Sequence, residues 1–167
     1  GGVPSYAVAL VAESEDALQI DLAVQTSLEQ LIGEANLLFG GPHRYHGYHF
    51  LVTLSDPIAK IAQEHHESSD NRFRELSLKE PDSFKTQGDV LPHEFVHAWN
   101  GKSRRPLGLA TKNYQEPMLD NLLWVYEGLT QYLGEVLAAR SGAWSPETYR
   151  ENLALTAAML DRRSGRG

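Results

Sequence analysis

The sequence predicts a single α+β domain. Strand-like segments lie mostly in its first half and strongly periodic helical segments in its second, an order typical of α+β folds. At 167 residues the chain has the length of one domain. A chain of this size can bury about two-thirds of its unfolded surface, enough for a core without disulfides. A hydrophobic fraction of 41% and a charged fraction of 22% also exclude wholesale disorder.

Two apolar, partly β-branched runs predict buried strands, at residues 6–12 and 48–54. Between them, apolar side chains recur at helical spacing over residues 17–39, which predicts an amphipathic helix. The sequence Gly-Gly-Pro at residues 40–42 is typical of a helix end.

The chain then becomes more polar. Residues 64–71 predict a loop or a sheet edge, residues 73–78 a short strand, and residues 81–88 a loop.

Three helices are predicted in the second half. The first runs from a cap at Asp89 to about residue 100. Residues 101–119 contain several glycines and prolines and are expected to be irregular. A strong helix follows at residues 122–140, and a Ser-Pro-Glu start signal opens the last one, at residues 148–162.

Charge and composition exclude several classes of partner. The net charge is −7, whereas a nucleic-acid duplex or an anionic membrane attracts basic surface, so we expect neither as a partner. The sequence contains no cysteine, so a metal would be held by histidine and carboxylate side chains. No secretion signal is recognisable, and cytoplasmic and periplasmic locations both stay open.

The segment His93-Glu94-Phe95-Val96-His97 carries the spacing of a zinc site. Two histidines four residues apart on a helix share one face, so both rings can reach one ion. Glu94 then lies close enough to act as general base on a water at that ion. The alternative is a helix with two surface histidines, which seldom occurs by chance with this spacing.

Glu127 is the predicted third ligand, because a catalytic zinc needs three protein ligands and one open position. It lies in a largely apolar stretch of the next helix, an unusual place for an unpaired carboxylate. Glu127, Gln131 and Glu135 share a helix face, so a neighbour of the ligand is expected to hold the free ring nitrogen of a ligand histidine. The alternative for Gln131 and Glu135 is that they only lie on a solvent-exposed face of the helix.

The extended pattern resembles a known family. The strings HEFVHAWNGK at residues 93–102 and LWVYEGLTQY at residues 123–132, with Arg105-Pro106 between them, resemble the glycyl-aminopeptidase family of gluzincin metallopeptidases. The upstream residues 39–42 and 48–51 are similar to the stretch that precedes the active site in that family. The resemblance extends over roughly residues 28–149.

This resemblance implies a thermolysin-like catalytic domain with one Zn²⁺ per chain. His93, His97 and Glu127 take the positions of the zinc ligands, and Glu94 that of the general base. Residues 63–65 fall where the family carries a Gly-Leu-Glu-His motif on an edge strand.

That motif implies substrate-binding roles for Glu64 and His65, with Glu64 pairing with the free amino group of a peptide. Residues 61–63 depart from the family pattern, and an exposed loop charge is the alternative for Glu64. A tyrosine is expected to stabilise the oxyanion. Of the two near the motifs, Tyr114 and Tyr126, we favour Tyr114, with side-chain packing as the alternative for both. In related aminopeptidases this tyrosine comes well after the glutamate ligand, so a position beyond residue 167 is a further alternative.

Family members are several times longer, with a β-rich domain before the catalytic domain and a PDZ-like domain after it. We therefore expect residues 1–167 to be one catalytic domain of a longer protein, slow or inactive in isolation, with further domains of the parent chain as partners.

The predicted function is zinc-dependent hydrolysis of peptides near a free N-terminus, with small first residues such as Gly or Ala. An endopeptidase or amidase on the same site is one alternative. A non-catalytic scaffold in which the metal only links two helices is another.

Overall fold

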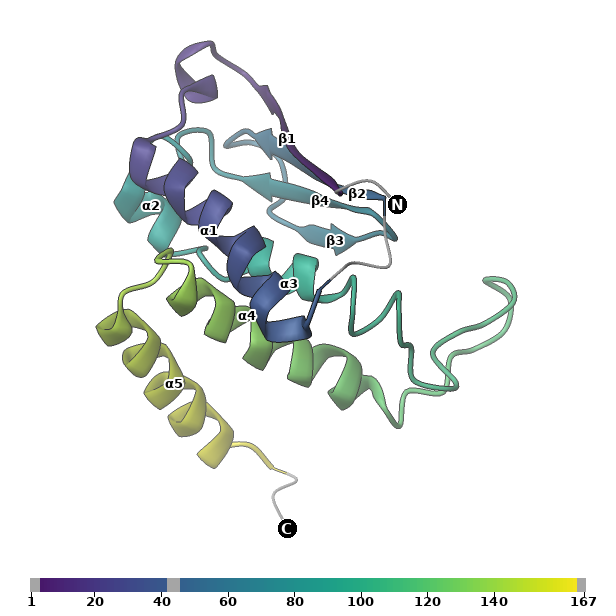
Figure 1. Cartoon of the computed structure of the whole chain (residues 1–167). Helices are drawn as coiled ribbons and strands as arrows, with labels where there is room; N and C mark the ends of the chain where they lie inside the picture. The colour runs from purple at the N-terminus through teal and green to yellow at the C-terminus, as the bar shows by residue number, and fades with distance from the viewer. Residues whose placement is uncertain (1–3, 42–45, 165–167) are drawn as a thin grey trace.

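The computed structural model describes residues 4–41 and 46–164 and shows a four-stranded sheet with helices packed against one face (Figure 1). The strands are β1 (Ser5–Ala12), β2 (Gly47–Leu54), β3 (Ala62–Glu64) and β4 (Ser68–Phe73). The helices are α1 (Leu22–Phe39), α2 (Pro81–Lys85), α3 (Val90–Val96), α4 (Leu129–Arg140) and α5 (Pro146–Asp161). A 3₁₀ turn, η1 (Asp16–Leu18), precedes α1, and a π-helical turn, η2 (Trp124–Gly128), leads into α4. The mixed α+β class is confirmed.

The sheet has the order β1-β2-β4-β3. The strands β1, β2 and β4 are parallel, whereas β3 runs antiparallel to β4 at the edge of the sheet. Glu64 pairs with Ser69 in this antiparallel register, at the last position of β3. The edge strand therefore ends at the residue that the sequence singled out for substrate binding.

A loop was one of the two expectations for residues 64–71. It is wrong, because most of these residues belong to β3 and β4. Their polar composition is not typical of buried strands, so the sequence pattern did not predict β4 as a strand. Ser69 and Asn71 occupy inward-facing positions of β4 and are fully buried. The Asn71 side-chain amide nitrogen donates to Ser69 Oγ at 2.9 Å and to the Leu51 carbonyl at 3.1 Å.

The hydrophobic core lies between the sheet and helices α1 and α3. Tyr48 and Phe50 of β2 pack against Phe95 of α3, with ring centroids 4.7 and 5.4 Å apart respectively. Tyr48 also donates a hydrogen bond of 3.1 Å to the Glu94 carbonyl. These contacts fix the helix that carries the HExxH motif against the centre of the sheet.

The helices differ from the expectations mainly at their ends. The predicted helix at residues 17–39 begins at Leu22, where Asp21 Oδ1 accepts from the Ala23 amide, and it ends before Gly40, whose φ is +76°. Pro42 of the predicted end signal lies outside the described residues. Residues 81–85, expected to be a loop, form the short helix α2 because the buried ring of Phe84 anchors it.

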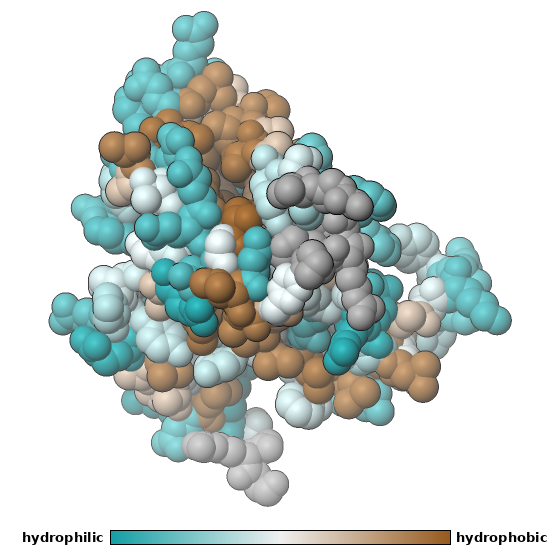
Figure 2. All heavy atoms as spheres, in the orientation of Figure 1, coloured by the Kyte–Doolittle hydropathy of each residue, from teal (hydrophilic) through white to brown (hydrophobic). Residues whose placement is uncertain are grey.

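Beyond α3 the chain makes a long irregular excursion at residues 101–123, which projects away from the sheet (Figure 1). The final helix α5 packs on α4 but buries none of its residues fully. Among the described residues, none of the helices is both long and apolar enough to cross a bilayer. Figure 2 shows apolar surface where β1 approaches α1.

Candidate metal centre and active site

The candidate site forms where α3 packs against η2 and α4. These elements can approach closely because position 134 is a glycine: a Cβ there would lie 2.9 Å from the His93 Cα atom and 3.0 Å from its amide nitrogen. No side chain larger than hydrogen fits between these backbones without moving one helix. Gly134 therefore allows α4 to bring Glu127 and Gln131 to the HExxH helix.

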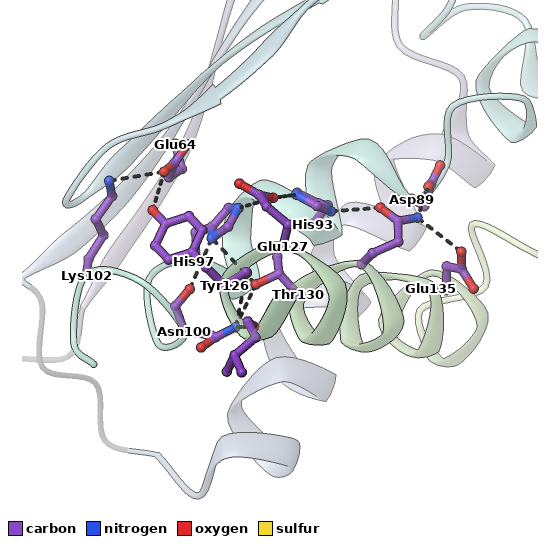
Figure 3. Close-up of polar contacts among 12 residues, drawn as sticks. Glu64, Asp89, His93, His97, Asn100, Lys102, Tyr126, Glu127, Thr130 and Glu135 are labelled. Atoms are coloured by element: carbon purple, nitrogen blue, oxygen red, sulfur yellow. Dashed lines mark hydrogen bonds and ion pairs between the residues drawn. The ribbon is translucent and has the colours of Figure 1, made fainter. Parts of the chain in front are cut away.

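Three predicted ligands converge on one point (Figure 3). Glu127 Oε2 lies 3.4 Å from His93 Nε2 and 3.6 Å from His97 Nε2. The three ligand atoms all lie within 4.8 Å of one another. Neighbouring ligands of a tetrahedral zinc with bonds of about 2.0–2.1 Å are separated by roughly 3.4 Å. The spacing of these donors therefore fits a zinc ion.

The π-helical turn η2 carries Glu127. The sequence predicted one continuous helix over residues 122–140, but the chain is π-helical from Trp124 to Gly128 before α4 begins at Leu129. Such turns are uncommon and often occur at functional sites. Glu127 is half exposed, at the end of the turn that faces the two histidines.

Gln131 orients the first histidine. Its Oε1 lies 2.9 Å from His93 Nδ1, and its amide nitrogen donates to Asp89 and Glu135, each at 3.0 Å. With Nδ1 donating to Gln131, Nε2 is left as the free lone pair that a metal needs. The structure thus places Gln131 in contact with the ring, and Glu135 one hydrogen bond further away.

The second histidine is held by groups that the sequence did not single out. His97 Nδ1 lies 3.0 Å from the Asn100 carbonyl and 3.5 Å from Thr130 Oγ1. The Asn100 side chain in turn donates to the Val125 carbonyl at 2.8 Å and to Thr130 Oγ1 at 2.9 Å. Burial lowers the pKa of His97, which favours the neutral ring that binds metals. An asparagine directly after the HExxH helix was the available sequence signal.

Glu94 faces the same space from α3. It is only 7% exposed, and its carboxylate lies within 4.8 Å of ligand atoms on Glu64 and His97. Burial, together with the negative charges of Glu64 and Glu127, raises its pKa to about 8. A cation held by the three ligands would favour the ionised form, which is the form that accepts a proton.

Glu64 is not an exposed loop charge. It lies at the end of edge strand β3, where the Tyr126 hydroxyl donates a short hydrogen bond to Oε1 and Lys102 Nζ lies 3.3 Å from the same oxygen. Burial opposes ionisation of Glu64, but the Tyr126 hydrogen bond, a backbone hydrogen bond and the neighbouring His97 and Lys102 outweigh it and lower its pKa. The structure thus holds a partly buried carboxylate in its charged form beside the metal-ligand cluster (Figure 3).

Two predicted residues lie apart from this cluster. His65 follows β3 with an exposed side chain, and its backbone amide donates to the Ser68 carbonyl at 2.8 Å. Tyr114 is fully exposed in the irregular excursion, so the structure does not support it as the oxyanion-stabilising tyrosine. The tyrosine at the site is Tyr126, whose ring centroid lies 4.7 Å from that of His97. The ring of Tyr126 is buried, which agrees with the alternative that this side chain packs inside the protein.

Comparison with known proteins agrees with this geometry. The model of the M61 glycyl aminopeptidase family matches residues 86–167, which include the HExxH helix and Glu127. The match covers just under half of the chain, and over this part the chain is similar to that family. The sequence-based prediction of a glycyl-aminopeptidase relative is thereby confirmed.

Among solved structures, the chain is similar to the crystal structure of an aminopeptidase N family protein from Idiomarina loihiensis, with a TM-score of 0.69 and 20% identity. The match covers 85% of this chain and 24% of that one, so the fold is shared over a quarter of a longer protein. A search of curated proteins found no match.

Proposed function

We propose that residues 1–167 form the catalytic domain of a zinc-dependent aminopeptidase with a thermolysin-like arrangement. The observation that carries the proposal is the convergence of His93, His97 and Glu127, with Glu127 Oε2 3.4 and 3.6 Å from the two Nε2 atoms. The match to a peptidase family over the same residues supports it.

The residues around these ligands supply the remaining chemistry. Zinc, when bound, supplies Lewis acidity and a water of lowered pKa. Glu94 accepts the proton of the attacking water and returns it to the leaving amine. Gln131 and the Asn100 carbonyl keep the two imidazole rings aimed at a common point, which preserves the ligand geometry during turnover.

Glu64 favours exopeptidase action. Its carboxylate is kept ionised by Tyr126 and Lys102, and an ionised carboxylate pairs well with a peptide ammonium group. It sits at the end of β3, an edge strand whose outer backbone groups can pair with an extended peptide. The family resemblance adds a preference for small first residues such as Gly or Ala.

The test compares zinc content and peptide cleavage in the full-length parent protein. We expect about one zinc per chain, and cleavage of a free peptide that is lost when its N-terminus is acetylated. Equal cleavage of both peptides would instead indicate an endopeptidase or amidase. Stoichiometric zinc with no hydrolysis of either peptide would indicate a structural metal.

A further inference from the structure

A polar groove of about 510 Å³ lies where the edge strand begins. Lys60 lines it from just before β3, and Arg74 from just after β4. The other wall comes from α2 and the turn that follows it, through Ser83, Thr86 and Gln87. Figure 1 shows α2 beside the end of the sheet at which β4 ends. Both charged side chains of this groove are therefore cations, in a chain whose net charge is −7.

The two cations of the groove are not neutralised by carboxylates. The Lys60 amine donates to three backbone carbonyls of the turn at residues 55–58, at 2.7, 3.1 and 2.8 Å, which fixes the amine and leaves its positive charge. The Arg74 side chain is exposed, and neither it nor Lys60 forms an ion pair within residues 4–41 and 46–164. Because a guanidinium binds a carboxylate through two parallel hydrogen bonds, the groove suits a carboxylate ligand.

The edge strand sets the direction in which a peptide reaches this groove. Glu64 is the last residue of β3, so a peptide whose amine meets Glu64 can pair with the strand only by running back along it, antiparallel. The Ile61 carbonyl and the His65 amide bond to β4. The backbone groups of Ala62 and Glu64 alternate with these and face the outer side of the sheet. A peptide paired there leads from Glu64 toward the groove at Lys60.

The spacing along the strand indicates the length of the peptide. Lys60 precedes Glu64 by four residues, which is roughly 13 Å of extended chain. An extended peptide of four residues spans about the same distance. The groove and the candidate site also lie on the same face of the sheet, because α2 lines the groove and α3 carries two of the proposed ligands. One peptide can therefore reach both.

We propose that this groove binds the C-terminal carboxylate of a short substrate peptide, so that free peptides of about four residues are the favoured substrate class. The proposal rests on the proposed function, because Glu64 has to hold the amine at the other end. Arg74 donates to the carboxylate and Lys60 adds positive charge, where the net charge of the chain would otherwise repel an anion. The preference for Gly or Ala as the first residue is unchanged.

The first experiment measures kcat/KM of the zinc-loaded full-length protein on the peptide Ala-Gly-Ser-Gly and on an octapeptide that repeats it, each as the free acid and as the C-terminal amide. A hydrogen bond to a charged group contributes about tenfold or more. We expect the acid to exceed the amide at least about tenfold for the tetrapeptide, and the two forms to be cleaved equally for the octapeptide, whose carboxylate lies beyond the groove.

Two results would overturn the proposal. Equal cleavage of the tetrapeptide acid and amide would show that the groove does not bind the carboxylate. The same acid-to-amide ratio for both lengths would show a general attraction of negative charge and no site at a fixed distance. Neither result affects the aminopeptidase proposal, which acetylation of the N-terminus tests.

A matched pair of variants tests the role of the guanidinium. Arg74 and Arg150 are both exposed, but only Arg74 lines the groove. We expect Arg74→Gln to bring the acid-to-amide ratio of the tetrapeptide close to one by raising KM for the acid, Arg74→Lys to keep part of the preference, and Arg150→Gln on α5 to keep all of it. A wild-type ratio in Arg74→Gln would overturn the assignment. Lys60 is not varied, because its amine also holds the turn at residues 55–58.

A binding measurement judges the groove independently of turnover. Calorimetry on the zinc-loaded Glu94→Gln protein compares the tetrapeptide acid with its amide, which share the free amine and differ only at the C-terminus. We expect the acid to bind at least about tenfold more tightly. Equal affinities would contradict the groove assignment even if the wild type cleaved neither peptide, a result that would contradict the proposed function instead.

Discussion

At the scale of single residues, Glu94 has the environment of a proton-transfer group. It is almost fully buried, has Glu64 and Glu127 as negative neighbours, and lies within 4.8 Å of ligand atoms on Glu64 and His97. The proposed ligands are His93, His97 and Glu127. Removing its charge should therefore affect turnover without removing the metal.

We expect Glu94→Gln to retain zinc and to lower kcat by about 10²–10⁴-fold, the usual contribution of a general base. Metal analysis and peptide kinetics on the full-length protein measure the two effects. Glu147→Gln, on the exposed face of α5, is the control and should match the wild type. Undiminished turnover in Glu94→Gln would remove Glu94 as the base.

A Gln131 variant tests whether the contact at Nδ1 orients the ring of His93. Gln131→Leu keeps the side-chain size but loses the 2.9 Å contact to His93 Nδ1. Because such partners typically change metal affinity about 10–100-fold, we expect zinc binding to weaken by that factor. Competition with a fluorescent chelator measures it, with Gln25→Leu on the exposed face of α1 as the control. Unchanged affinity would show that Gln131 serves packing alone.

At the scale of elements, the helices that carry the proposed ligands are held together by a close backbone approach at Gly134. A methyl group there would lie 2.9 Å from His93 Cα, which a relaxed structure cannot accommodate. The contact therefore couples the packing of α4 to the position of the HExxH helix.

We expect Gly134→Ala to destabilise the fold by about 1–3 kcal/mol, the usual cost of overpacking. It should also weaken zinc binding, because α4 must shift Glu127 and Gln131 away from the histidines. Thermal unfolding and chelator competition measure the two effects. Gly33→Ala in α1, where a methyl group would meet nothing within 4 Å, is the matched control and should be neutral or stabilising. Wild-type zinc affinity in Gly134→Ala would contradict the coupling.

The elements also show where sequence patterns succeed and fail. Apolar runs predicted β1 and β2, and apolar periodicity predicted α1 and α4. The start signal Ser-Pro-Glu predicted α5, which buries none of its residues fully. Apolar periodicity missed β4 as a full strand because two polar residues, Ser69 and Asn71, fill inward positions. It also missed the π-helical turn, since η2 has the composition of an ordinary helix.

In the candidate site, too, some features could be predicted from the sequence and others could not. The spacing of His93 and His97 predicted their shared face, because a helix fixes that geometry locally. The pairing of Tyr126 with Glu64 joins residues that are 62 positions apart, and the Asn100 bonds to η2 and α4 depend on how the chain returns after the excursion. Such contacts are set by tertiary packing and leave no periodic signal in one sequence.

At the scale of the whole molecule, a bound ion would link the HExxH helix to the segment that follows the excursion. Because zinc binds the folded arrangement and not the separated ligands, it should stabilise the fold by linkage. At a free zinc concentration of 1,000 times the dissociation constant, this amounts to about 4 kcal/mol.

We therefore expect zinc to raise the thermal unfolding midpoint of the wild-type chain, and chelation to reverse the increase. Glu127→Gln should show a much smaller rise, while Glu151→Gln on α5 should behave as the wild type. Differential scanning calorimetry with and without zinc measures the shifts. An equal rise in Glu127→Gln would show that another group completes the metal site.

The irregular excursion at residues 101–123 has a practical consequence. Its two flanks are fastened to each other, because the Asn100 side chain donates to the Val125 carbonyl and to Thr130 Oγ1 beside the close packing of α3 and α4 at Gly134. Its central part can thus be exchanged for a loop of different length or composition without dismantling the scaffold that holds the histidines. Grafting such loops would change the surface beside the proposed metal centre while leaving the three proposed ligands in place.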